Sequence, residues 1–306
     1  MSRTRLRGIE LAGIRLAIEA PPSLPWTLPD ASIGALACSP WEPDLYVGVR
    51  VGRPHVPPCE TVVYRSRGVT FEVGRVDEEW VIAVYGPGGC ERVACFDSDL
   101  RQGEGVISPE AARSCRYPLQ HPLDELVVLH RLALEGGLLL RGRTLLQNGR
   151  ALLLLGGATQ MPGDSPAASS GSLQDAAVVN EQYVALRIRE DACGGREVWL
   201  HTLPWSVETA GSESICAPLE AIHVTEAGET LSAEHLVGDR AICEILEHAF
   251  APVHDSEYAE RLLCSVESVA SSVPVLRIRN PAPRHVLPMA WGRREAALGY
   301  APPSTA

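Results

Sequence analysis

Apolar and polar residues alternate through much of the first hundred positions, and this pattern predicts β-strands. The alternation is weak over residues 1–20, where it favours a strand pair, and it returns at Leu45–Val51. It is clearest over residues 61–96, where two pairs of alternating runs flank Ser66-Arg67-Gly68 and Gly86-Pro87-Gly88-Gly89. Glycine-rich links of this length between alternating runs are typical of hairpins. The first third of the chain is therefore predicted to form a small antiparallel sheet.

The pattern changes to a helical period at Leu123–Glu135. Asp124 and Glu125 suit the positive end of a helix dipole, and Gly136-Gly137 supplies a stop signal. His130 falls on the apolar face of this helix, so we expect a packed or half-exposed side chain rather than a catalytic one.

Two strongly apolar strands follow, Leu138–Leu146 and Ala151–Leu155, joined by Asn148-Gly149, a preferred two-residue hairpin turn. Their apolar character on both faces predicts a covered sheet. Glycine, proline and serine then dominate to Ser172 and exclude a long helix. Shorter strands are predicted further on, and these are Ala176–Val179, Tyr183–Arg189, Glu197–Leu200 and Leu219–Thr225.

The C-terminal part is predicted to hold two helices, one from Ser232 to about Phe250 and one from Asp255 or Ser256 to about Ala270, followed by a strand at Val273–Ile278. Together these elements predict an α/β (α+β) protein. We expect a β-rich N-terminal subdomain at residues 1–116, a mixed-sheet core with flanking helices at 117–280, and a loosely ordered proline-rich tail at 281–306.

Charge and composition limit the partners and reactions that this chain can have. The net charge of the 306 residues is −11, which argues against a nucleic-acid or anionic-membrane partner because both need a basic surface. All 27 basic residues are arginine, a bias that high-GC coding explains. The absence of lysine excludes both a lysine Schiff base and a phosphate-loop lysine.

The nine cysteines are scattered without a C-x-x-C pair, so no zinc site is expected. The N-terminus lacks an apolar segment of secretory length. We therefore expect free thiols in a cytoplasmic protein.

From His121 onward, the order of elements and motifs resembles the HPr kinase/phosphorylase family, in particular its short relatives from bacterial peptide-modification gene clusters. The residues that carry the resemblance are the Asn148-Gly149 hairpin, the strand that ends at Gly156, the spacing from there to Asn180-Glu181, the Pro204-Trp205 segment and the strand from Ala217. The resemblance covers residues 121–280. It implies a phosphoenolpyruvate carboxykinase-type kinase core.

The sequence departs from that family at the residues that would carry out phosphoryl transfer. The resemblance places the equivalent of the phosphate loop at Gly156, Gly157, Gly163, Asp164 and Ser165, with no lysine and with Pro162 removing an amide donor. Arg141 replaces the family's histidine, and Asn180-Glu181 replaces its Asp-Asp pair. These replacements remove much of the positioning and charge stabilisation on which phosphoryl transfer depends.

Two functions follow from the resemblance. The first is a pseudokinase that binds or regulates a peptide or protein partner, such as an active kinase or modification enzyme, and that needs no cofactor. The second is an active serine kinase that uses ATP and Mg²⁺, in which Arg141 or Arg143 clamps phosphate. Glu181 would then serve as metal ligand or base, with Asn180 beside it. An unrelated hydrolase or binding module is a third interpretation, and a homo-oligomer is compatible with the sequence.

Each candidate residue also has a plain structural interpretation. Arg141 and Arg143 are strand residues that can pair with surface carboxylates, and Glu181 can be a solvated turn residue. Asp164 and Ser165 can be ordinary loop residues. His201 is expected to be packed, and Trp205 is expected to anchor its loop in the core.

Overall fold

The computed structural model describes residues 4–24, 37–66, 69–156, 177–180, 183–190, 194–203, 205, 215–230, 232–250 and 256–280. For a few strand residues in these ranges (37, 60, 62, 63, 65, 66, 177–180 and 280) it describes the backbone alone. The chain forms two compact units. The first unit comprises Met1–Glu135 with Pro252–Ala259, and the second comprises Gly136–Ala251 with Glu260–Ala306.

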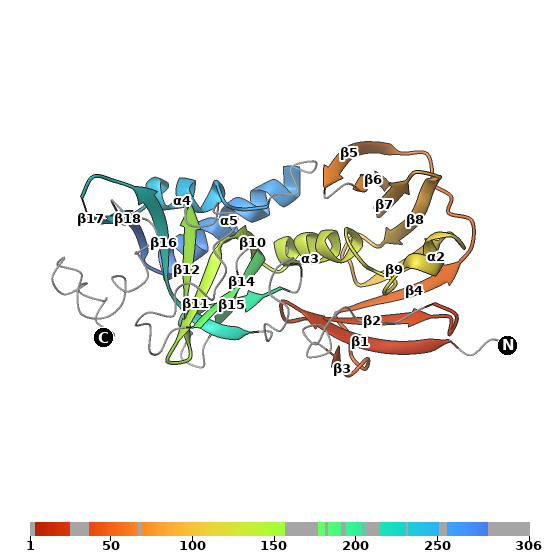
Figure 1. Ribbon diagram of the computed structural model, residues 1–306, viewed down its shortest axis with the longest axis horizontal. Helices are drawn as coiled ribbons and strands as arrows, with labels where there is room; N and C mark the ends of the chain where they lie inside the picture. The colour runs from red at the N-terminus through yellow and green to blue at the C-terminus, as the bar shows by residue number, and fades with distance from the viewer. Residues whose placement is uncertain are drawn as a thin grey trace. The chain divides into compact units, whose positions relative to one another are not determined.

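The first unit is built on a nine-stranded sheet in the order β3-β1-β2-β4-β9-β8-β7-β6-β5 (Figure 1). Its strands are β1 (Arg5–Leu11), β2 (Ile14–Ala20), β3 (Ala37–Cys38), β4 (Leu45–Val51), β5 (Glu60–Ser66), β6 (Val69–Val76), β7 (Glu79–Gly86), β8 (Gly89–Phe96) and β9 (Gln102–Ile107).

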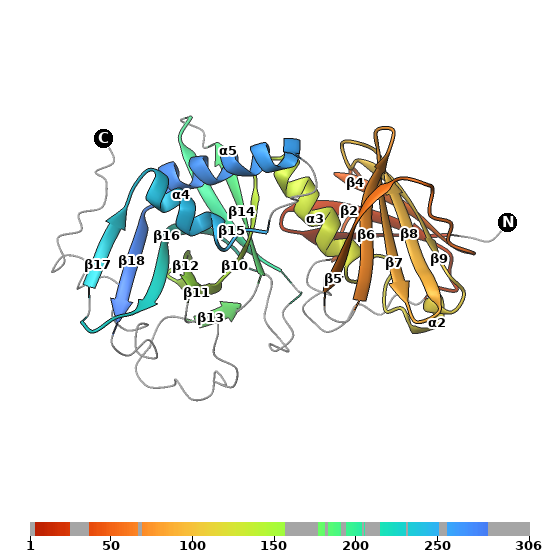
Figure 2. The same ribbon diagram turned by 90° about the horizontal axis from the view of Figure 1, so that it is seen from above.

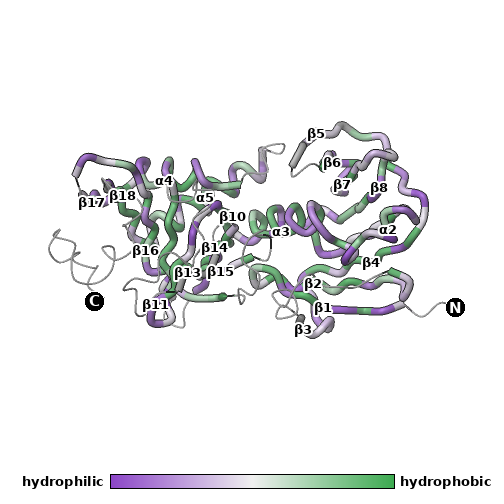
Figure 3. Tube along the Cα trace, viewed as in Figure 1, coloured by the Kyte–Doolittle hydropathy of each residue, from purple (hydrophilic) through white to green (hydrophobic). Residues whose placement is uncertain are grey.

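Two helices belong to this first unit, the short α2 (Ala111–Ser114) and the longer α3 (Leu123–Leu134). Figure 3 shows the apolar residues of α3 in green, interrupted by hydrophilic ones. His130 of α3 is buried and its ring packs 4.9 Å from that of Trp80. The ring of Tyr258 lies 5.3 Å from that of His130. Of the two expectations for His130, packed or half-exposed, the packed side chain is therefore confirmed.

The second unit is built on a mixed sheet in the order β10-β14-β15-β16-β12-β11-β13, to which β18 and β17 are added beside β16. Its strands are β10 (Leu138–Arg141), β11 (Arg143–Gln147), β12 (Arg150–Gly156), β13 (Ala177–Asn180), β14 (Tyr183–Glu190), β15 (Arg196–Thr202), β16 (Cys216–Ala227), β17 (Ser232–Leu236) and β18 (Val275–Asn280).

The long strand β16 organises this second sheet. Its beginning, Cys216–Pro218, pairs antiparallel with β15, whereas its end, Ile222–Ala227, pairs parallel with β18. On the other side of β16, strand β12 pairs parallel with Leu219–Thr225. The neighbouring parallel strands β12, β16 and β18 therefore bring their carboxyl ends to one end of the sheet.

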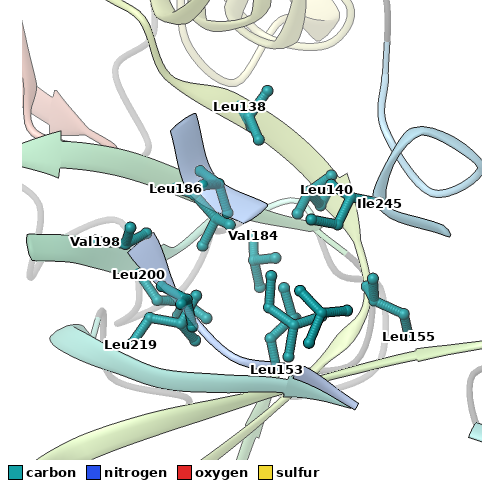
Figure 4. Close-up of a cluster of buried hydrophobic side chains, with 14 of the residues drawn as sticks. Leu138, Leu140, Leu153, Leu155, Val184, Leu186, Val198, Leu200, Leu219 and Ile245 are labelled. Carbon is teal, nitrogen blue, oxygen red and sulfur yellow. The ribbon is translucent and has the colours of Figure 1, made fainter. Parts of the chain in front are cut away.

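Helices α4 (Asp239–Leu246) and α5 (Ser256–Ser272) cover one face of this sheet (Figure 2). Under them lies the main core, with leucine and valine side chains from β10, β12, β14, β15 and β16 and Ile245 of α4 (Figure 4). The continuous apolar run of β12 is explained by burial on both faces, because Leu153 and Leu155 enter this core while Leu152 and Leu154 enter a second cluster on the opposite face.

The fold class predicted from the sequence is confirmed, but several elements differ. The predicted strand Leu138–Leu146 is broken at Gly142, because β10 pairs with β14 and β11 pairs with β12. A β-carbon at Gly142 would stand 2.9 Å from the carbonyl oxygen of Leu154. The chain can therefore change partners here only because residue 142 has no side chain.

The prediction of a helix starting at Ser232 is wrong. Residues Ser232–Leu236 form β17, which pairs with β18, and the helix α4 begins only at Asp239. The first sheet also departs from a purely antiparallel arrangement, since β4 runs parallel to both β2 and β9. Strand β9 was not predicted.

The sequence-based boundary after residue 116 falls inside the first compact unit. The buried side chain of Arg92 explains this arrangement, because it donates hydrogen bonds to the carbonyl oxygens of Gln120 at 2.7 Å and His121 at 3.0 Å. These bonds tie the entry to α3 to the first sheet. The proposed tail at 281–306 lies outside the described residues.

None of the helices in the described ranges combines the length and the apolar character that a bilayer crossing requires.

Candidate functional site

The carboxyl end of β12 is the place where the sequence analysis put a phosphate loop. Gly156 has a φ of +90°, and a β-carbon on it would stand 2.6 Å from the carbonyl oxygen of Thr225. The hydroxyl of Thr225 donates to the carbonyl oxygen of Leu155 at 2.9 Å. Strand β12 is therefore fixed tightly against β16 up to its last residue, in a backbone conformation that favours glycine.

The two candidate arginines lie at this end of the sheet. Arg143 begins β11 and pairs across the ladder with Leu154, two residues before Gly156. Arg141 ends β10, pairs with Tyr183, and donates its backbone N–H to the carbonyl oxygen of His248 at 2.8 Å. Arg141 is exposed and forms no ion pair with any residue of the described ranges. The alternative interpretation of Arg141, an ion pair with a surface carboxylate, is thus not seen in the described ranges.

The position of the acidic pair lies nearby. The backbone of Asn180, the last residue of β13, pairs with Thr144 of β11. The structure therefore brings Arg141, Arg143, Gly156 and the backbone of Asn180 to one end of the second sheet. The remaining predicted site residues, Gly157, Gly163, Asp164, Ser165 and Glu181, lie outside the described residues.

Sequence reasoning missed a buried histidine at this end of the sheet. His223 of β16 pairs with Leu154 of β12, so Arg143, Leu154 and His223 share one cross-strand row. The side chain of His223 is only 1% exposed, and neither ring nitrogen has a hydrogen-bond partner in the described part of the chain. Burial lowers the pKa of His223 to about 4, so the imidazole is neutral at pH 7. In the sequence, the only sign of this buried histidine is its position as a polar residue within an otherwise apolar run.

The other arginines near the ends of β16 and β18 are balanced by carboxylates. Arg277 forms an ion pair with Glu244, and its Nε lies 3.1 Å from an oxygen of Glu226. Arg279 lies 3.2 Å from the other oxygen of Glu226, and Arg240 lies 2.6 Å from Glu234. A guanidinium that is already paired in this way is a poor candidate for clamping a phosphate group. Arg141, which forms no ion pair in the described ranges, therefore remains the better candidate.

An aromatic group lies beside Arg141. The ring of Tyr183, its cross-strand neighbour, stacks on Phe250 with 5.2 Å between centroids and meets Trp205 edge-on at 6.0 Å. Trp205 is buried, whereas Tyr183 and Phe250 are half-buried. The loop that Trp205 was predicted to anchor lies mostly outside the described residues. This corner of the second unit thus presents one exposed cation next to accessible aromatic surface.

No metal site is apparent in the described ranges, since no three His, Cys, Asp or Glu side chains there are grouped to hold an ion. The chain matches no known family model, and no curated protein matches it.

Proposed function

We propose that this chain is a cytoplasmic, kinase-like protein without phosphoryl-transfer activity, which binds a peptide or protein partner in the biosynthesis of a modified peptide. One observation carries the proposal. The end of β12, where the resemblance to HPr kinases places the phosphate loop, belongs to a chain with no lysine at any position. The close contact of Gly156 with Thr225 keeps the strand end in place, while the lysine that would reach the β- and γ-phosphates is missing.

The corner formed by Arg141, Tyr183 and Phe250 supports partner binding. An exposed guanidinium next to a half-buried aromatic stack suits a peptide segment with one acidic and one apolar side chain, because arginine and aromatic residues dominate binding hot spots. We assign the partner contact to this corner.

Nucleotide binding provides the first test. Thermal denaturation of the full chain with and without millimolar Mg-ATP is expected to show the same midpoint, because a nucleotide that does not bind the folded state does not stabilise it. A clear rise in the midpoint, together with transfer of labelled γ-phosphate to any peptide, would contradict the proposal.

Partner binding is tested by co-purification with the proteins encoded beside this one. Arg141→Ala is expected to abolish recovery of the partner. The matched control is Arg150→Ala, since Arg150 is an exposed strand arginine that lies 3.8 Å from Glu220 and away from the aromatic corner. Equal recovery with both variants would exclude the corner as the contact.

A second candidate function, an active ATP-dependent kinase, is favoured by one specific observation. The register of the β11–β12 hairpin pairs Arg143 with Leu154, two residues before the glycine at which the resemblance would begin the phosphate loop. Arginine is a competent phosphate ligand. In this case Mg-ATP would stabilise the chain, and Arg143→Ala would remove both the stabilisation and the transfer. If Arg143→Ala changes neither the stabilisation by Mg-ATP nor the transfer, Arg143 does not clamp a phosphate.

A further inference from the structure

Three strands of the second sheet bring a thiol, an imidazole and a guanidinium together. Cys216 begins β16 and pairs with His201 of β15. The sulfur of Cys216 lies 3.7 Å from Nε2 of His201 and 3.8 Å from a terminal nitrogen of Arg189, which itself lies 3.4 Å from the same Nε2. Leu200 and Ala217, the neighbours of His201 and Cys216, enter the core under α4 and α5. The cluster therefore lies on the opposite face of the sheet.

The protonation of His201 follows from its partners. A guanidinium only donates, so Nε2 of His201 accepts and the ring proton is on Nδ1. Burial, reinforced by Arg189 and Arg187, lowers the pKa of His201 to about 4. The imidazole therefore stays neutral. It orients the thiol of Cys216 and the guanidinium of Arg189, but it does not hold the proton that the thiol loses.

The guanidinium of Arg189 is held next to the sulfur by an aromatic ring. Its central carbon lies 4.5 Å from the centroid of Trp199, within the range of a cation–π interaction. The indole N–H of Trp199 in turn donates to a carboxylate oxygen of Glu197 at 2.8 Å. Cys216 is exposed, so this fixed positive charge lies next to a sulfur that reagents in solution can reach.

We propose that Cys216 is a thiol-modification site that exchanges with small, carboxylate-bearing disulfides of the glutathione type. The Cys216 thiolate attacks one sulfur of the disulfide, a new S–S bond forms and the old one breaks. The other half leaves as a thiolate, which takes up the proton that Cys216 released. The sulfur of Cys216 is oxidised and the leaving sulfur is reduced. Arg189 stabilises the negative charge shared among the sulfurs, and Arg187 adds attraction for the carboxylates.

The chain carries its own comparison, because Cys243 of α4 and Cys264 of α5 are also exposed thiols. Neither sulfur makes a hydrogen bond to any other residue in the described ranges. The experiment treats the full chain with oxidised glutathione at pH 7 and follows the mixed disulfide at each cysteine by peptide mass spectrometry. Cys216 is expected to react about tenfold faster than Cys243 or Cys264, as a cysteine beside a fixed cation does.

The variant Arg189→Gln is expected to reduce the rate at Cys216 to that of the two helix cysteines, with their rates unchanged. Arg196→Gln, which removes an exposed arginine from the same pair of strands, serves as the matched control and is expected to leave all three rates unchanged. Added salt provides a measurement without mutation, since it should slow the reaction at Cys216 most. The proposal is overturned if Cys216 reacts no faster than the other two thiols, or if Arg189→Gln leaves its rate unchanged.

Discussion

Gly156 lies so close to Thr225 that a β-carbon at position 156 would stand 2.6 Å from the carbonyl oxygen of Thr225. Because this contact is with backbone, no side-chain rotation relieves it. The positive φ of Gly156 adds a second penalty for any other residue.

Gly156→Ala is therefore expected to destabilise the second unit by about 3 kcal/mol, the sum of a strained backbone and a steric clash. Gly149→Ala is the control, because Gly149 also has a positive φ, of 75°, but a β-carbon there would meet nothing within 4 Å. It is expected to cost only about 1 kcal/mol. Urea denaturation of both variants measures the difference, and equal losses would show that the clash is relieved.

The neutral, buried state of His223 predicts loss of stability in acid. Its pKa is about 4 in the folded protein and 6.5 in an ordinary environment. The unfolded chain therefore binds a proton first as the pH falls, so stability is complete above pH 6.5 and declines from there through pH 4. Between pH 7 and 5 this histidine alone should remove about 2 kcal/mol from the free energy of unfolding. The pKa of His201 is lowered to a similar value, so its contribution to stability is lost over the same pH range.

His223→Leu should flatten this part of the pH dependence, measured as the unfolding free energy at pH 7 and pH 5. His55→Leu is the control, since His55 is exposed. If His223→Leu retains the full slope, the ring of His223 is not buried in neutral form.

Two threonines of the second sheet should respond in opposite directions to the same substitution. The hydroxyl of Thr144 is fully buried and has no partner in the described part of the chain, whereas that of Thr225 donates to Leu155. Thr144→Val should therefore stabilise the protein by about 1 kcal/mol, because an unsatisfied polar group leaves the core. Thr225→Val should destabilise it by about the same amount. Thermal and urea midpoints of the two variants provide the measurement, and shifts of equal sign would contradict this account.

Arg92 should be essential for the first unit. Its buried guanidinium bonds two carbonyl oxygens before α3, so Arg92→Met leaves both acceptors without their donor. We expect a loss of about 3 kcal/mol in the free energy of unfolding. Arg101→Met, at an exposed position, should change it by less than about 0.5 kcal/mol. Similar effects of the two substitutions would mean that the Arg92 bonds contribute little.

Local signals accounted for much of the fold and for part of the candidate site. The Asn148-Gly149 turn sets the register of β11 and β12, so the position of Arg143 near Gly156 follows from the hairpin alone. The helix α5 was also predictable, because its apolar period runs uninterrupted from its start near Ser256.

Features that depend on distant partners were not predictable in this way. Ser232–Leu236 is a strand because β18, some forty residues later, pairs with it and sets Glu234 opposite Arg277. The row of Arg143, Leu154 and His223 is likewise completed only by β16, which is far from β11 and β12 in sequence. A hydrophobic pattern shows that such strands exist but does not show which strands become neighbours.

The parallel pairing of β12, β16 and β18 also has a consequence for folding during protein synthesis. The bond from Thr225 to Leu155 joins residues 70 positions apart. While the chain leaves the ribosome, the apolar strand β12 therefore waits for β16 and then for β18 before both of its faces are covered. Chains that end before β18 would leave Leu152 and Leu154 without the cover of Leu276 and Ile278, and apolar surface exposed in this way promotes association between molecules. The second unit thus depends on β18 for solubility as well as for stability.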